Sequence, residues 1–237
     1  MSDILRDGPR AYAVTLADEL VCLDIASGKE LWKVSSGIVN DDFIATANPA
    51  LSSDRVFFGG MDGTVSALDA KSGRVIWKQK LGFRVSTSLA VSHDGVYVGT
   101  IAGRLYRLAT NTGEILSQYA LDAVPQGKLV LSTDSVLVTL GSEVVVSLDT
   151  DLAKARWTKK AAKEWTTARP YIWGDIVLLA DHGTLSASRL ADGTDVWTHD
   201  FPNVVRGVGS EGKILYVGTL QGTVYAYSPE AQPSNLH

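Results

Sequence analysis

The amino-acid sequence predicts an all-β fold, a β-propeller of about six four-stranded blades of which the last is incomplete. A repeat of about 40 residues runs through the whole chain, and each copy has the pattern of four short strands separated by turns. No stretch shows a convincing helical period, and no change in composition marks a linker between domains. We therefore expect a single domain over residues 1–237, with repeats at about 1–37, 38–82, 83–122, 123–161, 162–201 and 202–237.

The repeat is plainest in a turn that is followed by a tryptophan-bearing strand. Residues 66–77 repeat the pattern of residues 21–32. The first segment has Asp24, Gly28 and Trp32, and the second has Asp69, Gly73 and Trp77 at the same spacing. Later copies keep parts of it: Gly113 in the third, Asp149 and Trp157 in the fourth, Gly193 and Trp197 in the fifth. We expect these residues to be structural, because aspartate and glycine suit turns and an outer-strand tryptophan can pack across to the next blade. Ser117 replaces the third tryptophan, and restoring tryptophan there should be neutral or stabilising if the next blade offers a groove.

The second copy illustrates the four strands of a blade. Residues 49–51 form a short inner strand, and residues 56–59 are continuously apolar, as expected for a strand that is buried on both faces. After the hairpin signal Asp62-Gly63, residues 64–68 alternate between polar and apolar, and residues 74–78 form the outer strand. One such blade cannot bury both of its faces, so the blades must stack side by side.

The last copy lacks a recognisable outer strand. Pro229 and Pro233 interrupt the pattern, and no glycine–tryptophan segment follows them. Two alternatives stay open at this point: six blades could close as a ring, or the chain could be part of a larger propeller.

Composition excludes several classes of protein. With 45% hydrophobic residues and a net charge of −4, the chain is not disordered and has no basic field for nucleic acid. Cys22 is the single cysteine, which excludes an internal disulfide or a multi-cysteine metal site. No apolar run approaches the roughly 20 residues of a membrane span. Residues 1–10 carry no secretion signal. We therefore expect either a cytoplasmic protein or a mature or excised part of an exported protein.

The sequence offers no catalytic, cofactor or metal residues. The four histidines lack metal-ligand spacing: His93, His182, His199 and His237. Asp41 and Asp42 are adjacent carboxylates without further spaced oxygen ligands, and we interpret them as a solvated acidic loop. No nucleophilic elbow or phosphate-binding loop is present. We therefore expect a protein that is not an enzyme.

Binding residues are expected in the five segments that connect one blade to the next: residues 37–47, 82–88, 122–128, 161–169 and 201–207. These segments depart most from the repeat, and loops on a rigid scaffold commonly carry function. They contain the aromatic and charged residues that anchor protein interfaces: Asp42, Phe43, Arg84, Trp165, Arg169 and Arg206. The alternative is that Trp165 plugs the channel and the arginines pair with nearby acidic residues. The short hairpins, such as residues 61–63, are expected on the opposite face.

Residues 67–77 resemble the repeat of quinoprotein-type propellers, the PQQ-like and BamB-like family, whose pattern is Ala-x-Asp-x-x-x-Gly-x-x-x-Trp. The resemblance implies a propeller held together by tryptophan docking. It also implies that a quinone-dependent dehydrogenase would have eight blades, calcium-binding carboxylates and usually adjacent cysteines, which this chain lacks.

The function that the resemblance favours is a non-catalytic scaffold that binds a protein partner through loops at one face. The alternative that it leaves open is a ligand-sensing propeller domain, excised from a larger signalling protein such as a kinase, with a small ligand in its channel. The family also allows a periplasmic or other extracytoplasmic location.

Overall fold

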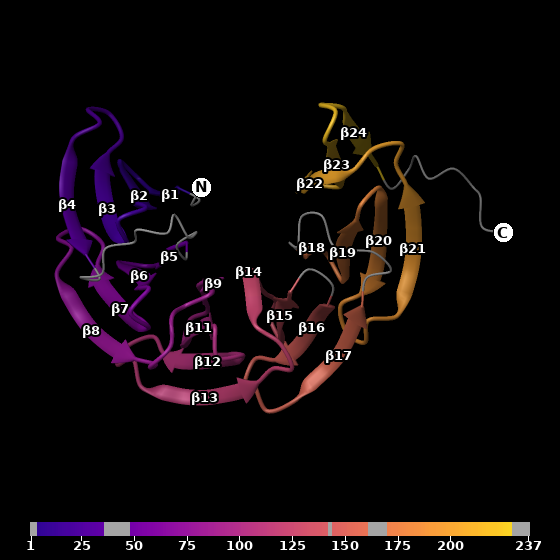
Figure 1. The fold of residues 1–237 in the computed structure, drawn as a ribbon. Coiled ribbons are helices and arrows are strands. Elements are labelled where there is room, and N and C mark those ends of the chain that lie inside the picture. Colours follow the sequence, from indigo (N-terminus) through magenta and orange to yellow (C-terminus); the bar gives the residue numbers. More distant parts are fainter. Residues whose placement is uncertain (1–3, 36–47, 142–143, 161–169, 229–237) are drawn as a thin grey trace.

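A computed structural model describes residues 4–35, 48–141, 144–160 and 170–228. The described residues form six β-sheets, here called blades 1 to 6, which stand around an arc (Figure 1). Blade 1 contains β1 (Leu5–Asp7), β2 (Arg10–Val14), β3 (Glu19–Asp24) and β4 (Glu30–Ser35). Blade 2 contains β5 (Ala50–Ser52), β6 (Arg55–Gly59), β7 (Thr64–Asp69) and β8 (Val75–Lys80). Blade 3 contains β10 (Ala90–Val91), β11 (Gly95–Thr100), β12 (Arg104–Ala109) and β13 (Ile115–Ala120).

The remaining three blades follow the same order. Blade 4 contains β14 (Pro125–Leu131), β15 (Ser135–Leu140), β16 (Val144–Asp149) and β17 (Ala155–Lys160). The short strand β9 (Thr87–Ser88) joins this sheet by pairing in parallel with β14. Blade 5 contains β18 (Tyr171–Trp173), β19 (Ile176–Asp181), β20 (Thr184–Arg189) and β21 (Asp195–Asp200). Blade 6 has β22 (Val205–Glu211), β23 (Ile214–Thr219) and β24 (Val224–Tyr227).

The predicted fold class is confirmed. All regular structure in the described ranges is β-strand, and blade 6 has three strands where the other blades have at least four. The alternative of a closed six-bladed ring does not hold for these residues, because the arc stays open between blade 1 and blade 6 (Figure 1).

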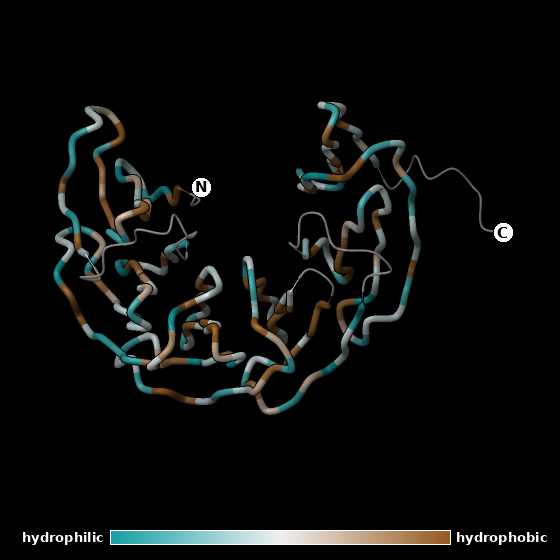
Figure 2. The backbone as a smooth tube through the Cα atoms, in the orientation of Figure 1, coloured by the Kyte–Doolittle hydropathy of each residue, from teal (hydrophilic) through white to brown (hydrophobic). Residues whose placement is uncertain are grey.

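The hydrophobic core lies between neighbouring blades. Tyr12 and Leu20 of blade 1 cluster with Val56 and Leu68 of blade 2, and all four side chains are fully buried. The same arrangement recurs around the arc, and Figure 2 shows hydrophobic segments within each blade. Because each blade is covered by apolar side chains of its neighbours, burial of apolar surface holds the blades side by side.

The direction of the strands defines two faces of the molecule. Neighbouring strands within a blade are antiparallel, so the connecting segments leave a blade at the end that carries its second hairpin, such as β6–β7. We call this the loop face, and the opposite one, which carries Gly28, Gly73, Gly113 and Gly193, the turn face. The prediction that the hairpins lie opposite the connecting segments is therefore wrong. Two antiparallel strands separate each second hairpin from the connecting segment that follows it, so the chain returns to the same end of the blade.

Candidate partner-binding face and blade junctions

Four of the six residues predicted to bind a partner lie outside the described residues: Asp42, Phe43, Trp165 and Arg169. The other two lie on the loop face. Arg84 is half-buried in the segment between blades 2 and 3, and Arg206 is exposed near the start of β22. Neither guanidinium forms an ion pair within the described ranges.

Backbone hydrogen bonds join each described connecting segment to the hairpin of the blade that it leaves. The Leu81 amide donates to the Gly63 carbonyl at 2.8 Å, and the Leu121 amide donates to the Gly103 carbonyl at 2.8 Å. The Phe201 amide repeats the contact with the Gly183 carbonyl at 2.7 Å. The end of each of these outer strands is thereby held against its own blade.

The next blade holds the same segments from the other side. The Ile101 amide of the β11–β12 hairpin donates to the Arg84 carbonyl at 3.0 Å. The Leu220 amide of the β23–β24 hairpin donates to the Val204 carbonyl at 2.8 Å. Hairpins and connecting segments thus form one hydrogen-bonded surface, which the sequence alone had divided between two faces.

Five exposed large apolar side chains of the described residues lie on this loop face. Leu16, Phe83 and Leu220 are 55%, 52% and 58% exposed, and Ile101 and Val124 are also exposed. Leu16, Ile101 and Leu220 belong to hairpins, whereas Phe83 and Val124 belong to connecting segments. The sequence analysis included the segments that hold Phe83 and Val124 without naming either residue. It missed the three hairpin residues, although a large apolar residue at the tip of a hairpin is a usable signal because nothing in a blade covers it.

A cavity of about 610 Å³ opens beside the connecting segment between blades 3 and 4. Tyr119 and Leu121 line it from one side, and Val144 and Lys160 line it from the other. Asp122 adds a carboxylate to the lining. A cavity with apolar walls and few charges is able to accept an aromatic or aliphatic side chain.

An ion pair steadies one hairpin of the loop face. Lys80 Nζ lies 2.9 Å from Asp62 Oδ2, and the Asp62 carboxylate also accepts a hydrogen bond from the Thr64 amide at 2.8 Å. Burial would raise the pKa of Asp62, but the hydrogen bonds from Thr64 and Lys80 outweigh it and lower that pKa. The carboxylate is therefore charged, and its contacts lie within the hairpin.

On the turn face, tryptophans join neighbouring blades. Trp77 Nε1 donates to the Thr110 carbonyl at 2.9 Å, and its ring covers Gly113, where a Cβ would approach it to 2.5 Å. Trp157 repeats the contact with the Leu190 carbonyl at 2.9 Å and covers Gly193. Trp197 packs against the apolar cluster that includes Leu215 and Val217 of blade 6.

Between blades 1 and 2 the contact is shared by two side chains. Trp32 covers Gly73, but its buried Nε1 has no partner among the described residues. The equivalent carbonyl, that of Ala70, instead accepts a hydrogen bond of 3.0 Å from the Tyr12 hydroxyl. Burial is the main reason that the pKa of Tyr12 is raised to about 12, and the nearby Cys22 is the next.

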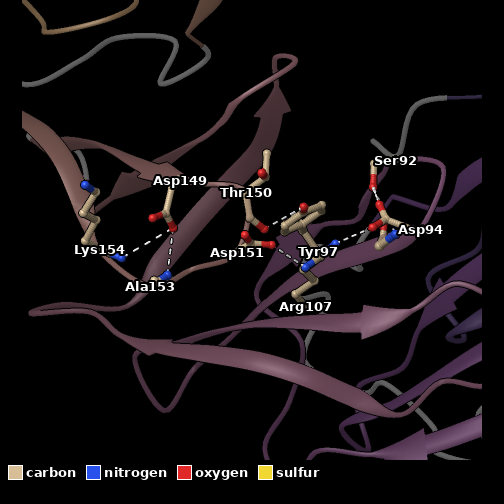
Figure 3. A network of polar contacts seen from close by, with 10 residues as sticks. Ser92, Asp94, Tyr97, Arg107, Asp149, Thr150, Asp151, Ala153 and Lys154 are labelled. Carbon is tan, nitrogen blue, oxygen red and sulfur yellow. Dashed lines mark hydrogen bonds and ion pairs between the residues drawn. The ribbon is translucent and has the colours of Figure 1, made fainter.

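Between blades 3 and 4, where Ser117 replaces tryptophan, a tyrosine alone makes the contact. The Tyr97 hydroxyl donates to the Thr150 carbonyl at 2.8 Å, beside Arg107, which bridges Asp94 and Asp151 (Figure 3). Leu152 adopts a positive φ of 57° and is buried in the same cluster as Tyr97. Leu152 therefore takes up part of the contact between blades 3 and 4, where a tryptophan at position 117 would have to pack.

The predicted turn aspartates cap their turns. Asp24 Oδ1 and Asp69 Oδ1 accept hydrogen bonds of 2.8 Å from the amides of Ser27 and Ser72. Asp149 Oδ1 accepts one of 2.7 Å from the Ala153 amide. Hydrogen bonds from the serine side chains, then from their amides, lower the pKa of Asp24 and of Asp69.

Within the described ranges, no three histidine, cysteine, aspartate or glutamate side chains gather in a way that would hold a metal ion. In the same residues, no helix is long and apolar enough to cross a membrane.

Comparison with curated proteins gives relatives of two kinds. Outer membrane protein assembly factor BamB of Yersinia pestis is 24% identical over 187 residues, which are 72% of this chain and 48% of that protein. The BamB of Kangiella koreensis is 28% identical over 128 residues, 54% of this chain and 31% of that protein. A 1-butanol dehydrogenase (quinone) of Thauera butanivorans is 33% identical over 75 residues, 30% of this chain and 12% of that protein. The chain spans less than half the length of these relatives.

Solved structures and a family model agree on the architecture. The crystal structure of BamB from Moraxella catarrhalis superposes with a TM-score of 0.76 at 20% identity, covering 98% of this chain and 70% of that one. The family model described as "Outer membrane protein assembly factor BamB" matches residues 4–199. Because this match includes most of the sequence, the chain belongs to the PQQ-like, BamB family of β-propellers.

Proposed function

We propose that this chain is a non-catalytic scaffold that binds a protein partner through its loop face, in the manner of BamB. The observation that carries the proposal is the presence of exposed apolar side chains on that face, among them Leu16, Phe83 and Leu220. Apolar groups that stay exposed on an otherwise well-packed protein commonly mark an interaction surface. The relatives named as outer membrane protein assembly factors support a partner that takes part in assembling outer-membrane proteins.

The chemistry of the loop face indicates the kind of partner surface that fits. Phe83 and Arg84 stand side by side, and Arg206 adds a second unpaired guanidinium. A partner with apolar side chains flanked by carboxylates would match this face. The cavity lined by Tyr119, Leu121 and Val144 would receive a single large side chain as an anchor.

Photo-crosslinking tests this assignment. A photoreactive phenylalanine analogue is placed at Phe83, at Leu220 or, as the matched control, at Leu116, which is 49% exposed on β13 away from the loop face. Each variant is mixed with a purified bacterial outer-membrane assembly complex. We expect positions 83 and 220 to crosslink to the same protein and position 116 to crosslink to none.

Affinity measurements complete the test with that purified protein. Phe83→Ser and Leu220→Ser should each weaken binding by roughly tenfold or more, as anchor residues do, whereas Leu116→Ser should not. Equal binding by all three variants would show that the partner does not use the loop face. The alternative, a ligand-sensing domain, stays a prediction and would require a small molecule that binds in the channel.

A further inference from the structure

The outer strand of each blade has a free edge. In blades 1 to 5 this strand pairs with the third strand on one side, and its other edge, on the outer circumference of the arc, has no partner strand among the described residues (Figure 1). The backbone N–H and C=O groups of such an edge are able to pair with a strand of another molecule. Soluble proteins commonly prevent this pairing by placing charged side chains, lysine above all, on the edge strand.

The outer strand of blade 3, β13, lacks this protection. Its sequence, Ile-Leu-Ser-Gln-Tyr-Ala, contains no charged residue and no proline. The other four outer strands each carry at least two charges: Glu30 and Lys33 in β4, Lys78 and Lys80 in β8, Arg156, Lys159 and Lys160 in β17, and Asp195 and Asp200 in β21. Among these strands, β13 is therefore the edge at which pairing meets no charge on the strand itself.

The same strand also exposes apolar side chains. Ile115 and Leu116 are 44% and 49% exposed. Isoleucine and tyrosine, both present in β13, are residues that favour strands. Blades 2 and 4 flank blade 3, so a further blade at either end of the arc would not reach this edge (Figure 1). Whatever pairs with it approaches from outside the circumference.

The order of residues along β13 makes the strand complementary to itself. Both of its ends are apolar, Ile115 and Leu116 at the start and Tyr119 and Ala120 at the finish, and the polar residues stand in the middle. When two copies of such a strand pair in antiparallel fashion, the start of one lies opposite the finish of the other. Apolar residues then meet apolar residues and the polar middles meet each other, which is the kind of cross-strand pairing that stabilises a sheet.

We propose that β13 is a dimerisation edge, and that its partner is the β13 strand of a second copy of this chain. The two strands pair antiparallel and join the two copies of blade 3 into one continuous sheet. Each copy contributes the same surface, so the assembly closes at two copies and does not grow into a fibre. The proposal concerns the outer circumference of the arc and does not depend on the loop-face binding proposed above.

Sedimentation velocity at increasing concentration tests the proposal on the chain of residues 1–237. We expect a species of twice the 25.4 kDa of one chain. Leu116→Lys places a charge on the edge and should leave the protein monomeric at concentrations at which the parent is a dimer. Ile76→Lys is the matched control, because Ile76 holds the corresponding position on β8 and is also exposed. It should dimerise as the parent does.

Hydrogen exchange shows whether strands pair. The backbone amides of β13 should become more protected as the concentration of the parent rises, whereas those of β8 should not change. The Leu116→Lys variant should lose this dependence. Protection that rises equally in β8 and β13 would contradict a specific edge.

The direction of pairing has its own test. Glu114 and Asp122 stand just outside the two ends of β13, so antiparallel pairing brings Glu114 of one copy toward Asp122 of the other. Glu114→Lys replaces this repulsion with an attraction and should strengthen dimerisation. Unchanged or weaker dimerisation of this variant would contradict the antiparallel arrangement.

Two further results would overturn the proposal. The first is a parent chain that stays monomeric at its highest soluble concentration. The second is a dimer that Leu116→Lys leaves intact or that Ile76→Lys abolishes equally. A photoreactive residue at position 116 should join two copies of this chain and none of the proteins of the assembly complex, so it remains a valid control for the loop face. Failure of loop-face binding would leave the dimer unchanged, and the two proposals fail separately.

Discussion

A single backbone carbonyl recurs at each junction of blades 1 to 5, and its donor differs from junction to junction. Tyr12 and Tyr97 donate a hydroxyl to Ala70 and Thr150, whereas Trp77 and Trp157 donate an indole N–H at the other two junctions: to Thr110 and to Leu190. A buried carbonyl without a donor costs free energy, and either side chain removes that cost. Tyr12 and Tyr97 stand on the second strand of a blade, outside the tryptophan repeat, so the repeat pattern does not reveal that they share a role with tryptophan.

The Tyr12 hydroxyl provides the first prediction. Tyr12→Phe should lower the free energy of unfolding by about 1–3 kcal/mol, because it leaves the buried Ala70 carbonyl without a donor. Urea denaturation measures the change. Tyr119→Phe is the control, since no hydrogen bond joins that half-buried hydroxyl to another described residue. Equal losses in both variants would refute the role of the hydrogen bond.

The pH dependence of the same residue provides the second prediction. The neutral hydroxyl is the donor, and the pKa of Tyr12 is raised to about 12 by burial. In the unfolded chain tyrosine loses its proton near pH 10. The stabilising contribution is therefore complete below about pH 10 and declines as the pH rises toward 12. The difference in unfolding free energy between the parent and Tyr12→Phe should shrink over that interval, and a constant difference would contradict the assignment.

Position 117 provides the third prediction. The sequence predicts a neutral or stabilising Ser117→Trp only if the next blade offers a groove, and the buried Leu152 packs with Tyr97 at this junction. The larger ring should overpack it and cost about 1–3 kcal/mol. Adding Leu152→Gly should recover part of the loss, because glycine empties the site and suits the positive φ of Leu152. Thermal melts of the single and double variants compare the two. A leucine with positive φ is rarely foreseen from sequence, since glycine normally takes that conformation.

At the scale of secondary-structure elements, the outer strands contribute through their tryptophans. Trp77 is 8% exposed and contacts two blades, so Trp77→Ala should cost about 3–5 kcal/mol, as truncation of a large core aromatic does. Its neighbour on β8, Ile76, is 38% exposed, and Ile76→Ala should cost less than about 1 kcal/mol. Comparable unfolding midpoints for the two variants would show that tryptophan docking contributes little.

The strands were predictable from the sequence because the turn residues that end them are local signals. Asp62-Gly63 and the turn at Gly73 fix the ends of β7 and β8, and the continuous apolar run of β6 marks a buried strand. The side of the blade on which a hairpin lies is not local, because it depends on counting strand directions from the start of each copy. For that reason the sequence did not predict how the loop face is arranged, nor that its hairpins carry exposed apolar residues.

At the scale of the whole molecule, the open arc makes the blades unequal. Blade 3 is covered on both sides, whereas blade 1 and blade 6 each have one described neighbour (Figure 1). In a stack of repeats, stability is roughly the sum of each repeat's own term and its neighbour contacts. We expect the backbone amides of β2 and β23 to exchange with deuterium faster than those of β11. Hydrogen exchange measured by mass spectrometry makes the comparison, and uniform protection would contradict it.

The hydrogen bonds that join connecting segments to hairpins also bear on how this protein can evolve. They run between backbone groups, such as the Arg84 carbonyl and the Ile101 amide, and therefore place no demand on the side chains. Substitution at Phe83, Arg84 or Val124 can therefore change the chemistry of this surface while the course of its backbone stays the same. Under the proposed function, a lineage of such propellers could exchange one partner for another by changing side chains alone.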